Sequence, residues 1–305
     1  MGSSYPTIRN IIKLGRLRFL WLGFSLYLLG ALLALASGAA FGFDRFVFGY
    51  IVLMTGHLSV HYSNDYFDYE VDSKTVAGAL SGGSGILPRH PELLGVARGL
   101  GIALAAASVL LAVAFVLFYR FPWYYLGFAI FGNLLSWYYT APPVRLAYRG
   151  LGEIATMIAV GFLMPGIGDF STFGTFSPAF LAFAVPLLLY SLSFILNVEV
   201  PDMEGDAACG KHTFVAHRGR GFAFVMIGAM ALLATAYLAV LALAPAPFDL
   251  RPAFAFSLAP LAPALYGMVK QPCDREEAVK LVKVNVGCFL LIILLMDAYL
   301  LFIHL

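Results

Sequence analysis

Charged residues are scarce in this sequence. Asp, Glu, Lys and Arg make up 12% of the 305 residues, about half of their usual share in a globular protein. The net charge is only +2, so we expect no nucleic-acid partner held by a basic surface. Hydrophobic residues reach 61%, which excludes an ordinary soluble domain, because a chain of this length cannot bury so much apolar surface.

Cysteine is scarce as well. Cys209, Cys273 and Cys288 form neither a CxxC pair nor the spacing of a zinc site, and three thiols cannot all pair. We therefore expect free thiols without a chemical role. No Gly/Ser linker or low-complexity tract divides the chain, so we predict a single transmembrane domain over residues 1–305.

Long apolar runs dominate the sequence. A run of about 20 residues matches the hydrocarbon core of a bilayer, which is about 30 Å thick. Nine such runs lie at residues 19–43, 46–63, 99–118, 122–141, 154–168, 178–196, 221–243, 252–269 and 284–303. The fifth is short and interrupted by glycine. We predict an all-α polytopic membrane protein with nine transmembrane helices around a central cavity.

The basic residues predict the orientation, because Lys and Arg accumulate in cytoplasmic loops. With nine spans and a cytoplasmic N-terminus, all 19 Lys and Arg residues fall on the cytoplasmic side except Arg45, Arg120 and Arg251. If the short run at 154–168 did not cross, the remaining basic loops would be split between the two sides. We expect a multi-pass protein of the cell membrane whose polar face is cytoplasmic.

An acidic stretch, "VHYSNDYFDYEVD" at residues 60–72, closes the second apolar run. Asn64, Asp68 and Asp72 are spaced by four, so on a helix they form one stripe over two turns. Such oxygen ligands suit Mg²⁺, which takes one or two carboxylates and completes its shell with water and substrate phosphates. Glu70 points away from this stripe. The alternative is that the whole stretch is a solvated acidic turn without a ligand.

A second acidic stretch, "NVEVPDMEGDAACGKHT" at residues 197–213, closes the sixth run in the same way. Asn197 ends the apolar segment, and Asp202 and Asp206 again stand four apart. The two stretches predict an internal pseudo-repeat, with motifs at 64–72 and 197–206, that holds paired Mg²⁺ ions. The predicted metal ligands are Asn64, Asp68, Asp72, Asp202 and Asp206.

Basic and aromatic residues gather at the same predicted face. The basic ones are Arg18, Lys74, Arg145, Arg149 and Lys211. Carboxylates for Mg²⁺ together with Lys and Arg for oxyanions are the combination that a diphosphate requires. In the segment "WYYTAPPVRLAYRGLGE" at 137–153, Tyr138 and Tyr139 could stabilise a cation or form an interfacial aromatic belt.

At these motifs the sequence resembles the UbiA-type superfamily of intramembrane prenyltransferases. The first motif matches the pattern NDxxDxxxD of that family from Asn64 to Asp72, and the second matches DxxxD followed by G-K-x-T at 202–206 and 210–213. The segments "YTAPPVRLAYRGLGE", "GGSG" at 82–85 and 197–213 look most like the 1,4-dihydroxy-2-naphthoate polyprenyltransferases of menaquinone synthesis. That branch commonly shows N-E-x-P-D, whereas here Val198 follows Asn197 and Glu199 comes one place later.

The resemblance implies Mg²⁺-dependent transfer of a polyprenyl group from its diphosphate to an aromatic quinone precursor, with release of pyrophosphate. It implies catalytic roles for Asp65, Asp68, Asp202 and Tyr139. It implies substrate binding by Arg18, Asn64, Lys74, Tyr138, Arg145, Asn197 and Lys211. Two alternatives are a non-aromatic lipophilic acceptor such as geranylgeranylglyceryl phosphate, and an ion-coupled transporter, although a transporter is expected to carry its acids near the membrane midplane.

Overall fold

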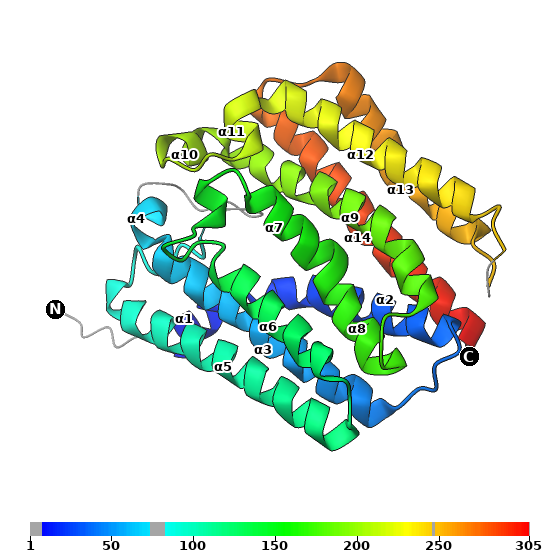
Figure 1. The fold of residues 1–305 in the computed structure, drawn as a ribbon. Helices are drawn as coiled ribbons and strands as arrows, with labels where there is room; N and C mark the ends of the chain where they lie inside the picture. Colours follow the sequence, from blue (N-terminus) through cyan, green and yellow to red (C-terminus); the bar gives the residue numbers. More distant parts are fainter. Residues whose placement is uncertain (1–7, 74–82, 246–247, 305) are drawn as a thin grey trace.

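The computed structural model describes residues 8–73, 83–245 and 248–304, and the described part is helical without any strand (Figure 1). The long helices are α2 (Leu20–Ala36), α3 (Phe43–Phe67), α5 (Leu94–Tyr119), α6 (Trp123–Trp137), α9 (Pro178–Glu199), α12 (Arg220–Leu241), α13 (Arg251–Lys270) and α14 (Arg275–His304). A further continuous helical segment consists of α7 (Gly152–Ile158), η4 (Ala159–Leu163) and α8 (Met164–Phe173). The prediction of an all-α protein is confirmed.

Every predicted apolar run falls on one of these helical segments, but the runs differ in length and polarity. Within the described residues, seven helices are long and apolar enough to cross a membrane. The two others are α6, whose 15 residues reach about 22 Å, and α3, which carries His57 and His61 in its apolar part. Nine crossings therefore stay a prediction for these two helices.

The short fifth run is longer in the structure than its hydropathy indicates. It extends from Gly152 to Phe173 because a π-helical segment, η4, joins α7 to α8 without ending the helix. Gly161 in this segment lies against α9, where a Cβ atom would come within 2.8 Å of the Leu187 carbonyl oxygen. Small residues at such crossings are typical of helix packing in membranes.

The two larger apolar cores of the bundle both include residues of α2. The first lies among α3, α5, α6 and α8 around Tyr27, Phe115 and Phe170. The second lies among α9 and α12–α14, and it includes Leu26 and Leu29 of α2. Figure 1 shows α9, α12, α13 and α14 side by side in one half of the molecule, and α3, α5 and α6 in the other.

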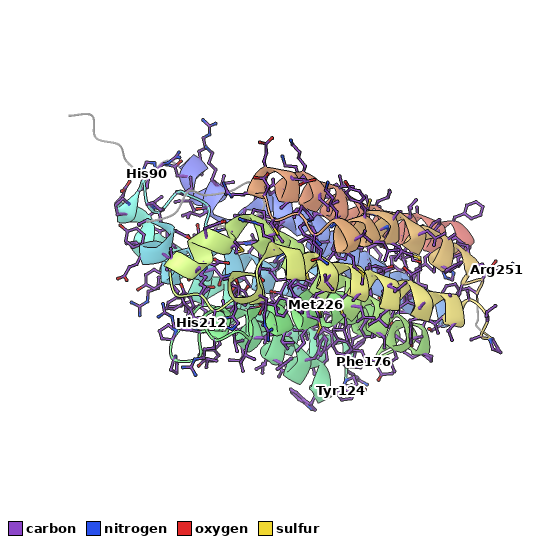
Figure 2. All side chains as sticks on the ribbon, turned by 90° about the horizontal axis from the view of Figure 1, so that it is seen from above. His90, Tyr124, Phe176, His212, Met226 and Arg251 are labelled. Atoms are coloured by element: carbon purple, nitrogen blue, oxygen red, sulfur yellow. The ribbon has the colours of Figure 1, made fainter. Side chains whose placement is uncertain are left out.

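The two acidic motifs lie at one end of the bundle, and the three basic residues predicted on the outer side lie at the opposite end. Arg45 is in the first turn of α3, whereas the first motif is at the end of α3. The hydroxyl of Tyr119, next to Arg120, donates to Asp44 at 2.9 Å. Figure 2 shows Arg251 at the end of the molecule away from His90 and His212.

Candidate active site

The first motif lies where α3 ends. Asp68 is the C-terminal cap of α3, and its N–H donates to the carbonyl of Asn64 at 2.9 Å. The chain then continues at once into α4 (Tyr69–Asp72), and the N–H of Asp72 donates to the carbonyl of Asp68 at 2.8 Å. These one-turn hydrogen bonds keep Asn64, Asp68 and Asp72 on one side of the helix end.

A polar cavity of about 190 Å³ lies between the two motifs. Its wall combines six acidic side chains with two basic ones and with neutral residues from five segments of the chain. The lining residues are Arg16, Asn64, Asp65, Asp68, Asp72, Gly83, Tyr139, Ala147, Ile195, Val198, Glu199, Asp202, Asp206, Lys211 and Thr213. The fold thus brings residues 64–72 and 199–213 together, as their sequence similarity predicted.

Asp65 is the most deeply buried acid of the first motif, with 2% of its surface exposed. The guanidinium of Arg16 forms a close ion pair with its carboxylate. The backbone N–H of Ser84 donates to both carboxylate oxygens, at 3.2 and 3.1 Å. A buried carboxylate needs such partners, since burial without them is costly. Asp65 therefore positions Arg16 and the segment that leads to α5.

Asp68 links the first motif to the segment after the second. The Lys211 ammonium lies 3.0 Å from one carboxylate oxygen, and the Tyr148 hydroxyl donates to the other at 2.7 Å. Burial lowers the pKa of Lys211, but the charge of Asp68, with Tyr148 and Asp206, outweighs burial and raises it. Burial and the charge of Asp68 raise the pKa of Tyr148, so the phenol remains a hydrogen-bond donor.

Asp72 carries negative charge that its surroundings do not fully balance. Burial, followed by the charges of Asp68 and Asp65, raises the pKa of Asp72 to about 6. Gly83 lies directly against this carboxylate, because a Cβ atom on Gly83 would come within 1.7 Å of Oδ2. The absence of a side chain at 83 therefore allows the backbone at this position to lie against the Asp72 carboxylate.

The second motif is built differently. Helix α9 ends at Glu199, a 3₁₀ turn follows at η5 (Val200–Asp202), and α10 (Met203–Ala208) carries Asp206. Pro201 lies in the 3₁₀ turn, where its missing N–H removes no helical hydrogen bond. The restart directs both Asp202 and Asp206 into the cavity.

Asn197 does not reach this cavity, unlike Asn64. It is 2% exposed, and its carboxamide bridges Ser193 and Asn285: its Nδ2 donates to the Ser193 carbonyl, while its Oδ1 accepts from Asn285 at 2.9 Å. Two residues along a helix correspond to about 200° of rotation, so Glu199 lies on the opposite side of α9 and lines the cavity instead.

The other predicted site residues fall into three groups. Asn64, Asp65, Asp68, Asp72, Tyr139, Asp202, Asp206 and Lys211 line the cavity. Arg18, Tyr138 and Arg145 do not: Arg18 is exposed with its guanidinium over Phe19, and Arg145 stacks on Tyr148 at 4.3 Å. Lys74 lies outside the described residues.

Arg16 is the principal residue that the sequence did not indicate. It adopts a left-handed backbone conformation with φ 43° between α1 (Ile8–Leu14) and η1 (Leu17–Phe19). Because of this turn, Arg16 points into the cavity, and Arg18, which we predicted in the site, points away from it. Nothing in "LGRLRF" distinguishes the two arginines, because a positive φ at a non-glycine residue is uncommon.

The carboxylates fit Mg²⁺ only together with a further oxygen ligand. Within the described ranges, no three His, Cys, Asp or Glu side chains lie close enough to hold a metal ion by themselves. The donors from both motifs nevertheless face one cavity, where burial and the charges of Asp68 and Asp65 raise the pKa of Asp72 to about 6. Mg²⁺ usually binds one or two carboxylates plus water and phosphate, so the residues fit an ion completed by a phosphate-bearing ligand.

A smaller, mostly apolar cavity of about 70 Å³ lies further along α3. It is lined mainly by α3, α6 and the η4–α8 segment, and Val60 on its wall is one helical turn from Asn64. Val52, Phe128 and Leu163 supply much of its apolar surface. An apolar space next to a polar one suits a ligand with a charged head and a hydrocarbon tail.

Several solved structures share this fold. A UbiA homolog from Archaeoglobus fulgidus bound to DMAPP and Mg²⁺ matches with a TM-score of 0.66 at 14% identity, over 93% of this chain and 98% of that chain. A UbiA homolog from Archaeoglobus fulgidus bound to GPP and Mg²⁺ gives a TM-score of 0.67 at 17% identity, over 94% of this chain and 99% of that chain. A structure described as digeranylgeranylglyceryl phosphate synthase gives 0.69 at 15% identity, over 95% and 97%.

Sequence comparison gives the family. None of the proteins with curated functions matches the chain. The model of the UbiA prenyltransferase family, however, matches residues 24–290, which include both acidic motifs and most of the bundle. The chain therefore belongs to the UbiA prenyltransferase family and is one of its enzymes.

Proposed function

We propose that this multi-pass membrane protein transfers a polyprenyl group from its diphosphate to an aromatic quinone precursor, with Mg²⁺, and releases pyrophosphate. The observation that carries the proposal is the single cavity in which both acidic motifs meet Arg16 and Lys211. Membership in a family of prenyltransferases removes the alternative of an ion-coupled transporter.

The diphosphate head belongs in the polar cavity. Asn64, Asp68 and Asp72 from one side, with Asp202 and Asp206 from the other, would hold Mg²⁺. The ion would neutralise charge on the diphosphate and so stabilise the leaving group. Two contacts prepare the first side: Thr140 donates to the Asn64 side-chain oxygen at 2.8 Å, and Lys211 and Tyr148 fix Asp68.

The basic residues bind the phosphate oxygens. Lys211 and Arg16 line the cavity and hold charge there, each already oriented by an aspartate. Arg145 acts through Tyr148, over which it stacks, and we retain it as a positioning residue. The exposed Arg18 and the side chain of Tyr138 are not retained in the site, because neither lines the cavity.

The allylic carbon lies, in this proposal, where the polar and apolar cavities adjoin. Tyr139 is on the wall of the polar cavity, and its hydroxyl lies beside Thr156. An aromatic face close to a developing carbocation stabilises it, by about 2 kcal/mol when the contact is desolvated. The hydrocarbon tail then extends along α3 into the apolar cavity.

The membrane arrangement forms part of the proposal. We propose nine crossings with the motif end in the cytoplasm of the cell. The distribution of basic residues supports this orientation, since Arg45, Arg120 and Arg251 lie at the opposite end from the motifs.

For the acceptor, we propose 1,4-dihydroxy-2-naphthoate, on the similarity of residues 139–153 and 197–213 to that branch. A second candidate is geranylgeranylglyceryl phosphate, because the fold of a digeranylgeranylglyceryl phosphate synthase matches over 95% of this chain. The two differ in their nucleophile, which is a ring carbon in the first and a hydroxyl oxygen in the second.

The test uses the purified protein in lipid nanodiscs with geranylgeranyl diphosphate, Mg²⁺ and each candidate acceptor, with products identified by mass spectrometry. Asp68→Asn and Asp202→Asn should each lower pyrophosphate release by about 10³-fold or more, with the helical content unchanged. Glu70→Gln is the matched control, since Glu70 is exposed in the same motif and does not line the cavity. Full activity in either aspartate variant contradicts the metal assignment.

A further inference from the structure

A large groove lies beside the polar cavity and opens on the outside of the bundle. It has a volume of about 500 Å³ and runs between α7 and α12, both of which pack on α9, with α11 (Phe214–Arg218) at its motif end. Ile154 of α7 lies on its wall and is 45% exposed. The volume is in the range of about 300–1,000 Å³ that ligand sites occupy.

The groove is closed toward the polar cavity. Thr213 lines both spaces, and Glu153 lines the groove. Each of these residues is only 6% exposed, and the Glu153 carboxylate accepts a hydrogen bond from the backbone N–H of Phe214. A molecule in the groove is therefore kept apart from the carboxylates of the two motifs.

Basic side chains stand at the motif end of the groove. His212, His217 and Arg218 line it and are exposed. The guanidinium of Arg218 lies over the Phe222 ring at 5.9 Å, and within the described ranges it forms no ion pair with a carboxylate. The acidic residue of the lining, Glu153, is buried and already bound by a backbone N–H. An arginine without a carboxylate partner, beside two imidazole groups, suits an oxyanion.

The deeper walls of the groove are apolar. Leu192 and Leu196 of α9 and Met226 of α12 supply them. Met226 comes six residues after the start of α12, which is about 9 Å along the helix axis. Figure 2 shows His212 toward the end of the molecule that carries His90, and Met226 toward the middle. Because α12 is long and apolar enough to cross a membrane, the groove extends from the level of the lipid headgroups into the hydrocarbon.

We propose that this groove binds an anionic phospholipid, with the phosphate beside Arg218, His217 and His212 and an acyl chain along α9 and α12. Basic pockets between transmembrane helices are typical sites of anionic lipid headgroups. Opposite charge selects the head, and the leucines and the methionine hold the chain. The inference goes beyond the proposed function, because it concerns a lipid that takes no part in the reaction and does not depend on the identity of the acceptor.

The first test compares two lipids with the same acyl chains and different head charge. The purified protein is titrated in detergent with phosphatidylglycerol or phosphatidylcholine, and the bound lipid is measured by native mass spectrometry. We expect phosphatidylglycerol to bind about fivefold more tightly, and Arg218→Ala to remove this difference.

Arg98→Ala is the matched control for this test. Arg98 is exposed near the start of α5, at the same end of the molecule, and its guanidinium lies over Tyr66 at 5.9 Å, but it does not line the groove. Equal affinity for the two lipids in the wild-type protein, a preference that survives in Arg218→Ala, or the same loss in both variants overturns the proposal.

The second test concerns the acyl chain. Met226→Trp should weaken the binding of both lipids by about tenfold, because the indole fills the deeper part of the groove. Val240→Trp is the control on the same helix, because Val240 is 66% exposed and does not line the groove. Unchanged lipid binding in Met226→Trp overturns the proposal. Arg218→Ala leaves the apolar walls intact, so the first test decides the matter even if Met226→Trp does not fold.

A soluble headgroup separates a lipid site from a site for a free anion. Glycerol 1-phosphate carries the phosphate without the chains, so it should bind the wild-type protein at least about tenfold more weakly than phosphatidylglycerol. If it binds as tightly as the lipid, the groove is a site for a soluble anion and the proposal is overturned.

Discussion

In the first acidic motif, distant parts of the chain hold each carboxylate: Arg16 and the Ser84 N–H bind Asp65, and Tyr148 and Lys211 bind Asp68. In the second, other helices hold the backbone of the 3₁₀ turn: Arg275 of α14 donates to the Pro201 carbonyl at 3.2 Å, and Arg220 of α12 donates to the Val200 carbonyl at 3.1 Å. Glu204 of α10 pairs with Arg220 at 2.7 Å, and the backbone of Asp206 accepts from the N–H of Lys211 at 3.0 Å.

This difference shows that equal spacing of carboxylates does not imply equal roles. In the first motif distant segments bind the carboxylates themselves, whereas in the second Arg220 and Arg275 bind backbone carbonyls of the 3₁₀ turn. Lys211 joins them, since it follows the second motif and contacts Asp68 of the first. We propose an internal repeat for the aspartates, and the asparagines depart from it.

The largest effect should come from removing the link between the motifs. Lys211→Ala leaves Asp68 without its cation and removes one phosphate ligand, so we expect kcat/KM for geranylgeranyl diphosphate to fall by about 10²–10³-fold. The change in kcat/KM is measured from steady-state pyrophosphate release. Lys280→Ala, which loses only an exposed pair with Glu276, is the control. A Lys211→Ala enzyme as active as the control would mean that the motifs work without this link.

The two neighbouring arginines test whether activity depends on a residue that contacts the first motif from a distant part of the chain. Arg16→Ala should lower kcat/KM by about 10–100-fold, because the buried Asp65 loses its ion-pair partner and the cavity one positive charge. Arg18→Ala should change it by less than about twofold, since its guanidinium lies outside the cavity. Both variants are measured in the same pyrophosphate assay, and a larger loss in Arg18→Ala would contradict the assigned directions.

The asparagines test where the repeat ends. Asn64→Ala should lower activity by about tenfold, because Asn64 lines the cavity, and stability by about 1 kcal/mol, because the buried Thr140 hydroxyl loses its acceptor. Asn197→Ala should instead lower stability by about 1–3 kcal/mol, because it leaves buried Asn285 without a partner. Thermal unfolding in detergent, together with activity, separates the two outcomes. A similar loss of activity in both variants would mean that the two asparagines have equivalent roles and that the repeat includes them.

The smallest effect concerns Asp72 in protein without Mg²⁺. Its pKa is raised by burial and by neighbouring carboxylates to about 6, so the folded protein loses stability as the pH rises from the ordinary value of 3.8 to about 6. Asp72→Asn should therefore stabilise the chelator-treated protein by roughly 1–3 kcal/mol at about pH 7.5 and hardly at all at about pH 3.5. Thermal unfolding at both pH values checks this, and equal stabilisation at both would exclude the ionisation as its cause.

Periodicity and spacing sufficed to predict the helices and the meeting of the two motifs, because both depend on local pattern and on the membrane. They did not suffice where one backbone angle decides the outcome. The left-handed turn at Arg16 exchanged the directions of Arg16 and Arg18, and the point at which α9 ends sent Asn197 toward α14 and Glu199 into the cavity. Both depend on packing between helices that are distant in sequence.

The position of α2 between the two apolar cores has a consequence for how the protein is made. Gly30 of α2 is pressed against α8, where a Cβ atom would come within 1.8 Å of the Pro165 carbonyl oxygen, and α2 also packs against α14. During synthesis, α2 therefore enters the membrane long before either partner exists. It can pack against α3 and then α8 as these emerge, but its contact with α14 forms last, so the bundle is completed only when its first and last long helices meet.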